Sequence, residues 1–275
     1  MKCLRQTAHR PWPLPRGPWV MAQSWHDLLF AHWRVPEALV RSVIPPALEV
    51  DTFDGSAWLG VVPFRMSGIR PRGLPPMPRV STFVEMNVRT YVRHRGRGGV
   101  WFFSLDASKP IAVAVARRWF HLPYFEARMS CDALDDGDVA YHSQRTHRGA
   151  APATFAGTYG PSGDVAPARA GSLEHWLTER YCLYTVDGRR RLIRGDIHHE
   201  PWPLQPAHAR IDVCTVPAAH GFDVSTRAFA ADGDRLRGDV PLRSTTAPEH
   251  VAFARRLDVA IWPPRAVGDA DRADG

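Results

Sequence analysis

Residues 80–92 read VSTFVEMNVRTYV, and this alternation decides the kind of fold that the chain can form. Successive side chains of a β-strand point to opposite faces, so the segment presents two distinct sides. The apolar side carries Val84, Met86, Val88, Thr90 and Val92. The polar side carries Glu85, Asn87, Arg89 and Tyr91. The apolar side must face a core, whereas the polar side faces either water or the interior of a closed barrel.

The segments around this strand extend it into a sheet. A glycine-rich turn at 93–99 leads to an apolar return strand at 100–106. Further strands are expected at 57–66, 123–131, 139–146, 153–159, 181–186, 191–199 and 251–262. Short helices are expected at 36–43, 109–120 and 172–180, and the first two have a proline at the first turn. This order predicts an α+β fold with a largely antiparallel, barrel- or cone-like sheet.

The 275 residues divide into three expected regions. Residues 1–20 are rich in proline and arginine and are expected to form a flexible leader, so Met21 is a candidate for the true start. Residues 21–266 show neither an internal repeat nor a linker and are expected to form a single domain. Residues 267–275 form a polar tail. The 25 prolines argue against a helical bundle.

Composition excludes several classes of function. The net charge is +7, but the arginines are scattered and no recognition helix is present, which argues against nucleic-acid binding. The apolar runs are too short to span a membrane, and no apolar segment follows the basic N-terminus of the kind that a secretory signal needs. The four cysteines are widely spaced, as in reduced cytosolic proteins. We therefore expect a cytoplasmic protein without a nucleic-acid or membrane partner.

Motif searches find no nucleotide-binding loop, serine-hydrolase elbow or zinc-binding helix, so neither a cofactor nor a metal site is expected. A second alternating row runs along the expected strand at 191–199 and includes Arg194, Asp196 and His198. Asp196 could orient the ring of His198 and tune it for acid–base work. The alternative is a surface ladder of opposite charges across a hairpin.

Several stretches in order resemble the YqjF-like family of uncharacterised bacterial proteins (DUF2071). The resemblance runs over residues 22–266 and rests on HDLLFAHWRVPEALVRSVIPPALEVDTFDGSAWLGVVPFRM, VSTFVEMNVRTYV, GVWFFSLDAS, ARRWFHLPYFEARM, LTERYCLYT, IHHEPWPLQPA and RRLDVAIWPP. More remotely, the family is similar to the acetoacetate decarboxylase superfamily. That resemblance implies a strand-built cone around a closed cavity, and decarboxylases of this kind react through an imine on a buried lysine.

Compared residue by residue, the resemblance to the superfamily implies that imine chemistry is absent here. Tyr124 and Phe125 stand where the resemblance places the reactive lysine and its activating neighbour. Lys109, the only lysine outside the leader, is expected to be solvated at a helix start. The resemblance also places Arg34 at the position of a site arginine.

These features predict a cavity that binds a small organic acid or carbonyl compound without Schiff-base decarboxylation. The expected catalytic residues are Glu85 and His198 for proton transfer and Tyr124 for an oxyanion. The expected ligand contacts are Arg34, Asn87, Arg89, Tyr91, Arg117 and Tyr184. Catalysis would be lyase- or hydrolase-like, and the alternative is a non-catalytic binding or scaffold protein on the same fold. A homo-oligomer is compatible with the resemblance.

Overall fold

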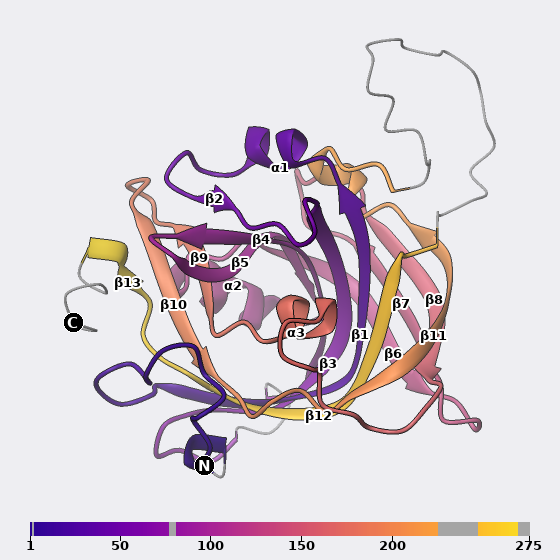
Figure 1. The fold of residues 1–275 in the computed structure, drawn as a ribbon. Coiled ribbons are helices and arrows are strands. Elements are labelled where there is room, and N and C mark those ends of the chain that lie inside the picture. The colour runs from indigo at the N-terminus through magenta and orange to yellow at the C-terminus, as the bar shows by residue number, and fades with distance from the viewer. Residues whose placement is uncertain (2, 77–80, 225–246, 269–275) are drawn as a thin grey trace.

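The computed structural model describes residues 1, 3–76, 81–224 and 247–268, which form one 13-stranded sheet with three α-helices (Figure 1). The strands are β1 (Met21–Val35), β2 (Glu49–Val50), β3 (Ala57–Pro71), β4 (Phe83–His94), β5 (Arg97–Ala107), β6 (Tyr124–Ala133), β7 (Val139–Arg145), β8 (Thr154–Pro161), β9 (Cys182–Val186), β10 (Leu192–His198), β11 (Leu204–Cys214), β12 (His250–Ile261) and β13 (Arg265–Ala266). The helices are α1 (Glu37–Val43), α2 (Pro110–Trp119) and α3 (Leu173–Thr178), with single 3-10 turns η1 (Cys3–Arg5) and η2 (Ala218–His220).

The sheet closes into two rings, because β5 and β12 each pair with two different strands along one edge. The first part of β5 pairs with β9 and the last part pairs with β6. On the far side, β12 pairs with β11 through one part and with β10 through another. A first ring therefore runs β5-β9-β10-β12-β1-β3-β4, and a second ring runs β5-β6-β7-β8-β11-β12-β1-β3-β4. The strands β12, β1, β3, β4 and β5 belong to both.

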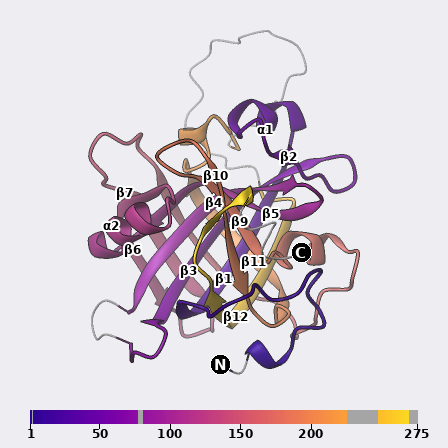
Figure 2. The same ribbon diagram turned by 90° about the vertical axis from the view of Figure 1, so that its left-hand side faces the viewer.

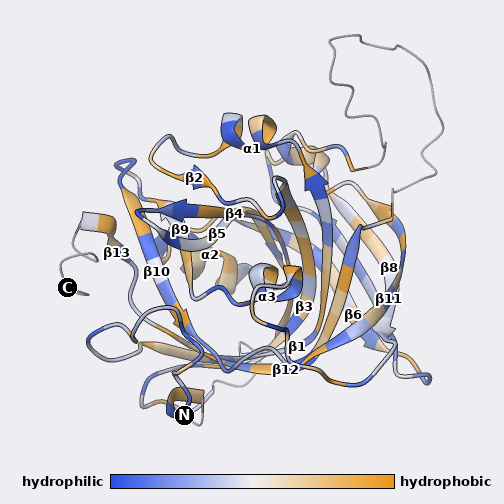
Figure 3. Cartoon of the chain, viewed as in Figure 1, coloured by the Kyte–Doolittle hydropathy of each residue, from blue (hydrophilic) through white to orange (hydrophobic). Residues whose placement is uncertain are grey.

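Both faces of the shared strands are consequently buried. On β4, Val88 packs in a cluster with the aromatic side chains of β7 and β8, in the second ring. Tyr91 instead packs with Trp58 and with Leu177 of α3, which lies across the opening of the first ring (Figure 1). Figure 3 shows both polar and apolar residues on the strands around this interior. The polar side of β4 is therefore turned inward rather than to water.

The expected α+β fold and largely antiparallel sheet are confirmed. All three expected helices form, and each strand predicted from alternation has a counterpart, although Val80 lies outside the described residues. The pairings of β5 with β6 and β9 are parallel, whereas the other assigned pairs are antiparallel. Two long strands, β1 and β11, escaped prediction. Leu28–Trp33 of β1 is buried on both faces, so its sequence is an apolar run rather than an alternation. Within the described ranges, no helix is long and apolar enough to cross a membrane.

The leader lies against the outer face of β10 (Figure 1). Cys3 is 3% exposed and Arg10 is 8% exposed. The Arg10 guanidinium donates to the carbonyl of Ile197 at 2.8 Å. Beyond β13, the polar tail expected at 267–275 falls outside the described residues except for its first two positions. In this structure the leader therefore covers part of the sheet.

Candidate functional site

A carboxyl–phenol pair lies inside the sheet, where β4 and β6 are both held by β5. Register places Glu85 of β4 opposite Ala107 of β5, and Leu105 of β5 opposite Tyr124 of β6. The Tyr124 hydroxyl donates to Glu85 Oε2 at 2.8 Å, and the Glu85 side chain is buried. The Tyr141 hydroxyl donates to the backbone carbonyl of Glu85 at 2.6 Å. The pair is thus held between β4, β6 and β7.

The surroundings keep both members of this pair protonated at neutral pH. Burial raises the pKa of Glu85 from its ordinary 4.5 to about 8, and this effect outweighs the Tyr124 hydrogen bond, which lowers the pKa by more than the nearby Asp106 carboxylate raises it. Burial, and then the adjacent Glu85, raise the pKa of Tyr124 well above its ordinary value. The site therefore holds a neutral carboxylic acid, which can donate a proton to a ligand.

The polar row continues along β4 with atoms that lack a partner. Asn87 Oδ1 and Arg89 Nε are buried and make no hydrogen bond to the described residues. The Arg89 guanidinium lies 5.4 Å from the ring centre of Phe30 and 5.7 Å from that of Tyr91. Buried polar atoms are normally satisfied, so these two atoms, which are among several buried atoms without a partner in the described residues, have hydrogen-bonding capacity that a ligand can use.

His32 joins this row from β1, although sequence analysis did not identify it. Its Nε2 lies 2.7 Å from the Tyr91 hydroxyl, and the residue is completely buried. Burial, reinforced by the nearby Arg89 cation, lowers the pKa of His32 well below its ordinary value, so the ring stays neutral. Gly60 on β3 makes room for the ring, because a Cβ there would lie 2.8 Å from His32 Nε2. We define the inner row as His32, Glu85, Asn87, Arg89 and Tyr91.

Arg34 and Tyr184, both expected as ligand contacts, lie away from the inner row. Arg34 is exposed, forms an ion pair with Glu249 at 3.3 Å and stacks over the Trp58 ring. Tyr184 is buried on the other face of the sheet and donates its hydroxyl to the carbonyl of Arg97. Within the described residues, neither side chain makes a hydrogen bond, ion pair or ring contact with the inner row.

His198 lies under the leader, where sequence analysis expected a site residue. Its Nδ1 is 3.1 Å from an Arg10 guanidinium nitrogen and its Nε2 is 2.8 Å from the carbonyl of Cys3. Asp196 pairs with Arg194 at 3.1 Å, so the expectation that Asp196 orients the His198 ring is wrong. Burial, with a smaller contribution from the nearby Arg10 cation, lowers the pKa of His198 to about 4, and the hydrogen bond to the Cys3 carbonyl opposes this only in part.

Arg117 is exposed on α2 and reaches the backbone of the site rather than its interior. Its Nη1 donates to the carbonyl of Tyr124 at 2.7 Å, and its guanidinium lies over the Phe125 ring. Arg117 therefore contacts the first residue of β6 from outside, while the hydroxyl of the same residue holds Glu85 from inside.

A buried ion pair in the second ring also escaped sequence analysis. Arg145 Nη2 lies 2.8 Å from Asp106 Oδ1, and both side chains are almost fully enclosed. The guanidinium stacks over Phe125 at 4.2 Å, which stands opposite Asp106 on β6. The two residues are 39 positions apart, and no local pattern links them.

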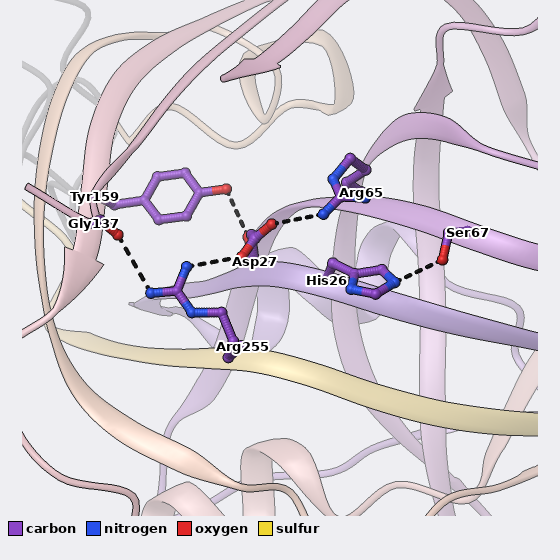
Figure 4. Close-up of polar contacts among 7 residues, drawn as sticks. All are labelled: His26, Asp27, Arg65, Ser67, Gly137, Tyr159 and Arg255. Carbon is purple, nitrogen blue, oxygen red and sulfur yellow. Dashed lines mark hydrogen bonds and ion pairs between the residues drawn. The ribbon is translucent and has the colours of Figure 1, made fainter. Parts of the chain in front are cut away.

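A further polar network, at an irregularity in β1, is satisfied by its own members (Figure 4). Asp27 has a φ of 54° and accepts hydrogen bonds from Arg65 at 3.1 Å and Arg255 at 3.0 Å. Its backbone carbonyl accepts the Tyr159 hydroxyl at 2.9 Å. Because these contacts tie β1 to β3, β8 and β12, we assign this network to the fold rather than to ligand binding.

The sequence matches the family DUF2071, described as an uncharacterized conserved protein, over residues 22–235. It is 41% identical over 252 residues to the uncharacterized protein YqjF of Bacillus subtilis (strain 168), which covers 92% of this chain and 94% of that protein. The fold is similar to that of the enduracididine biosynthesis enzyme MppR complexed with the condensation product of pyruvate and imidazole 4-carboxaldehyde. The TM-score is 0.58 at 10% identity, over 91% of this chain and 90% of that chain.

The fold is also similar to that of acetoacetate decarboxylase from Legionella pneumophila. This match has a TM-score of 0.55 at 13% identity and covers 94% of this chain and 93% of that chain. At these identities the likeness is one of fold, and it confirms the acetoacetate decarboxylase-like architecture that the sequence resemblance implied.

Proposed function

The chain belongs to the DUF2071 family of uncharacterized conserved proteins, and we propose that it binds a small organic acid or carbonyl compound at the inner row without forming an imine. The observation that carries the proposal is the neutral Glu85 carboxyl beside unpartnered atoms of Asn87 and Arg89. A carboxylate ligand would meet the Arg89 guanidinium, and a carbonyl oxygen would accept from Glu85. One fold relative, MppR, is described as complexed with pyruvate, which is a ligand of this class.

In the proposed site each polar side chain has one task. Arg89 holds the acid, and Asn87 and Tyr91 orient it from the same face of β4. Glu85 donates its proton where negative charge develops on the ligand, and Tyr124 stabilises the resulting carboxylate through its existing hydrogen bond.

Lysine chemistry has little support in this site. Lys109 is exposed at the cap of α2, and Lys2, the only other lysine, falls outside the described residues. An amine nucleophile needs burial or a cationic neighbour to be neutral, and an exposed cap supplies no burial. We therefore propose acid–base chemistry or binding alone, rather than Schiff-base decarboxylation.

Thermal-shift measurements with pyruvate, 2-oxobutyrate and acetoacetate test the binding proposal. We expect at least one acid to raise the melting temperature of the wild type and of Arg34→Met, but not of Arg89→Met. The two variants are a matched pair, because Arg34 is exposed at the rim and Arg89 lies along the inner row. The proposal fails if no acid stabilises the wild type, or if both variants respond alike.

Proton exchange separates an enzyme from a binding protein on the same site. In D2O, acid catalysis by Glu85 would promote deuterium uptake at the carbon next to the ligand carbonyl, which proton NMR detects. Loss of this exchange in Glu85→Gln supports catalysis. Binding without exchange supports the alternative, a non-catalytic ligand-binding protein.

A further inference from the structure

A surface groove of about 490 Å³ opens where β5 changes partner. Val100 and Trp101 pair with β9, and pairing with β6 starts only at Leu105. Between these contacts, Phe102 and Phe103 have no assigned strand partner on that edge within the described chain. Residues of β9 line one side of the groove, and the α2–β6 connection lines the other. Figure 2 shows α2 next to β6.

The lining of this groove is aromatic and apolar, with one unneutralised cation. Trp101, Phe102 and Phe103 are each only partly buried and all line the groove; Trp101 and Phe103 pack with one core cluster, and Phe102 packs with the clusters on the other face of the sheet. Arg117 projects from α2 at the edge of the same space. Asp187, also in the lining, is already neutralised, because Arg191 donates to its Oδ2 at 2.8 Å and two backbone N–H groups donate to its Oδ1.

Two hydrogen bonds fix the positions of the segments that line the groove. Arg117 uses one nitrogen, Nη1, to contact the Tyr124 carbonyl, which leaves the rest of its guanidinium edge for another acceptor. His121 has a φ of 53°, which is unusual for a residue other than glycine. Its carbonyl accepts the Thr185 hydroxyl at 2.6 Å, and this bond ties the two sides of the groove together.

We propose that this groove binds a monocarboxylate with an aryl or alkyl body. The single guanidinium edge matches one carboxylate, and the aromatic lining matches an apolar body of drug-like size. The groove is separate from the inner row: Tyr124 stands between them, with its carbonyl on Arg117 and its hydroxyl on Glu85. The inference therefore does not rest on the function proposed for the inner row.

The test uses 4-phenylbutyrate and its neutral match, 4-phenylbutan-1-ol, with binding followed by calorimetry. A charge-assisted hydrogen bond to Arg117 should make the acid bind about tenfold more tightly than the alcohol. Arg117→Gln should abolish this preference while the alcohol affinity stays the same. Arg118→Gln, an exposed neighbour on α2 outside the groove, is the matched control and should keep the preference.

Two further variants make the result decisive. Arg117→Lys keeps the charge and should retain part of the preference for the acid. This variant distinguishes the loss of the positive charge from a disturbance of α2. Glu85→Gln should leave the affinity for phenylbutyrate unchanged, so the groove and the inner row can fail independently. Equal affinities for acid and alcohol, or an equal loss in Arg118→Gln, would overturn the proposal.

Discussion

β4 and β10 each carry a row of polar side chains, and both rows are buried, but by different parts of the chain. On β4, Glu85, Asn87 and Tyr91 are no more than 5% exposed, and their neighbours are other strands and α3. On β10, His198 is fully buried, but its ring contacts Arg10 and the carbonyl of Cys3, both in the leader.

The inner row is thus buried by elements of the folded sheet, whereas His198 is buried by a segment that can leave without breaking the sheet. Exposing the inner row requires α3 to leave the opening of the first ring or one of the closed strand ladders to open. Exposing His198 requires only that residues 3–10 leave, and these residues belong to no strand of the described sheet. We therefore expect groups enclosed by the rings to control global stability and groups beneath the leader to control local opening.

The largest effect should come from breaking the ion pair that the second ring encloses. Arg145→Leu would leave the Asp106 carboxyl buried without its partner, which should lower the free energy of unfolding by about 3 to 5 kcal/mol. The matched control is the double variant Asp106→Leu with Arg145→Leu, which removes both charges and should recover much of the loss. Urea unfolding measures all three. If the free energy of unfolding of Arg145→Leu lay within about 1 kcal/mol of the wild-type value, which is roughly the contribution of one exposed ion pair, the rings would not keep Asp106 from water.

A pH dependence of comparable total size should come from Glu85. The pKa of Glu85 is raised from 4.5 to about 8, so its contribution to stability is complete below 4.5 and is lost as the pH rises through 8. Between these values, the free energy of unfolding of the wild type should fall by about 1.4 kcal/mol per pH unit relative to Glu85→Gln. Urea titrations of both proteins across this window measure the difference. Parallel curves would show that Glu85 is not protonated in the folded state.

A smaller loss should follow from filling the space that the inner row requires. In Gly60→Ala the new Cβ would lie 2.8 Å from His32 Nε2, so the ring must move and its contact with the Tyr91 hydroxyl must lengthen. We expect a loss of about 2 kcal/mol, typical of an overpacked core. Gly188→Ala is the control, because nothing lies within 4 Å of its Cβ position. If thermal melts show equal losses in both variants, the close approach at Gly60 is not needed.

Alternation identified β4, but it was neither required nor sufficient: β3 is buried on both faces and was predicted, whereas β11, whose exposure alternates, was missed. The 80–92 alternation identified β4 and both of its faces, because each face has a uniform character. In β1, Leu28–Trp33 is buried throughout and contains no β-branched residue, so neither alternation nor composition marks it as a strand. Since β1 carries His32, missing the strand also meant missing a member of the inner row.

The candidate site was predictable where a strand carries it and not where remote segments meet. Glu85 and Tyr124 were both singled out, and the structure joins them through β5. Arg34 was singled out by the family resemblance and His198 by alternation, yet Arg34 is exposed and pairs with Glu249, and His198 lies beneath the leader. Alternation predicts which side chains share a face, whereas the closure of the rings and the path of the leader decide what covers it.

The leader should be the first part of the molecule to open, and acid should open it. The pKa of His198 is lowered to about 4, so the bond to Arg10 is intact above the ordinary value of 6.5 and weakens as the pH falls toward 4, when two cations face each other. Hydrogen exchange should therefore rise at residues 3–10 on acidification while the amides of β4 stay protected. Arg10→Met removes one cation and should shift this opening to lower pH, whereas Arg5→Met, an exposed neighbour, should not. Equal exchange in the leader and β4 at every pH would mean that the leader is as firmly held as the ring strands, and the distinction between the two kinds of burial would disappear.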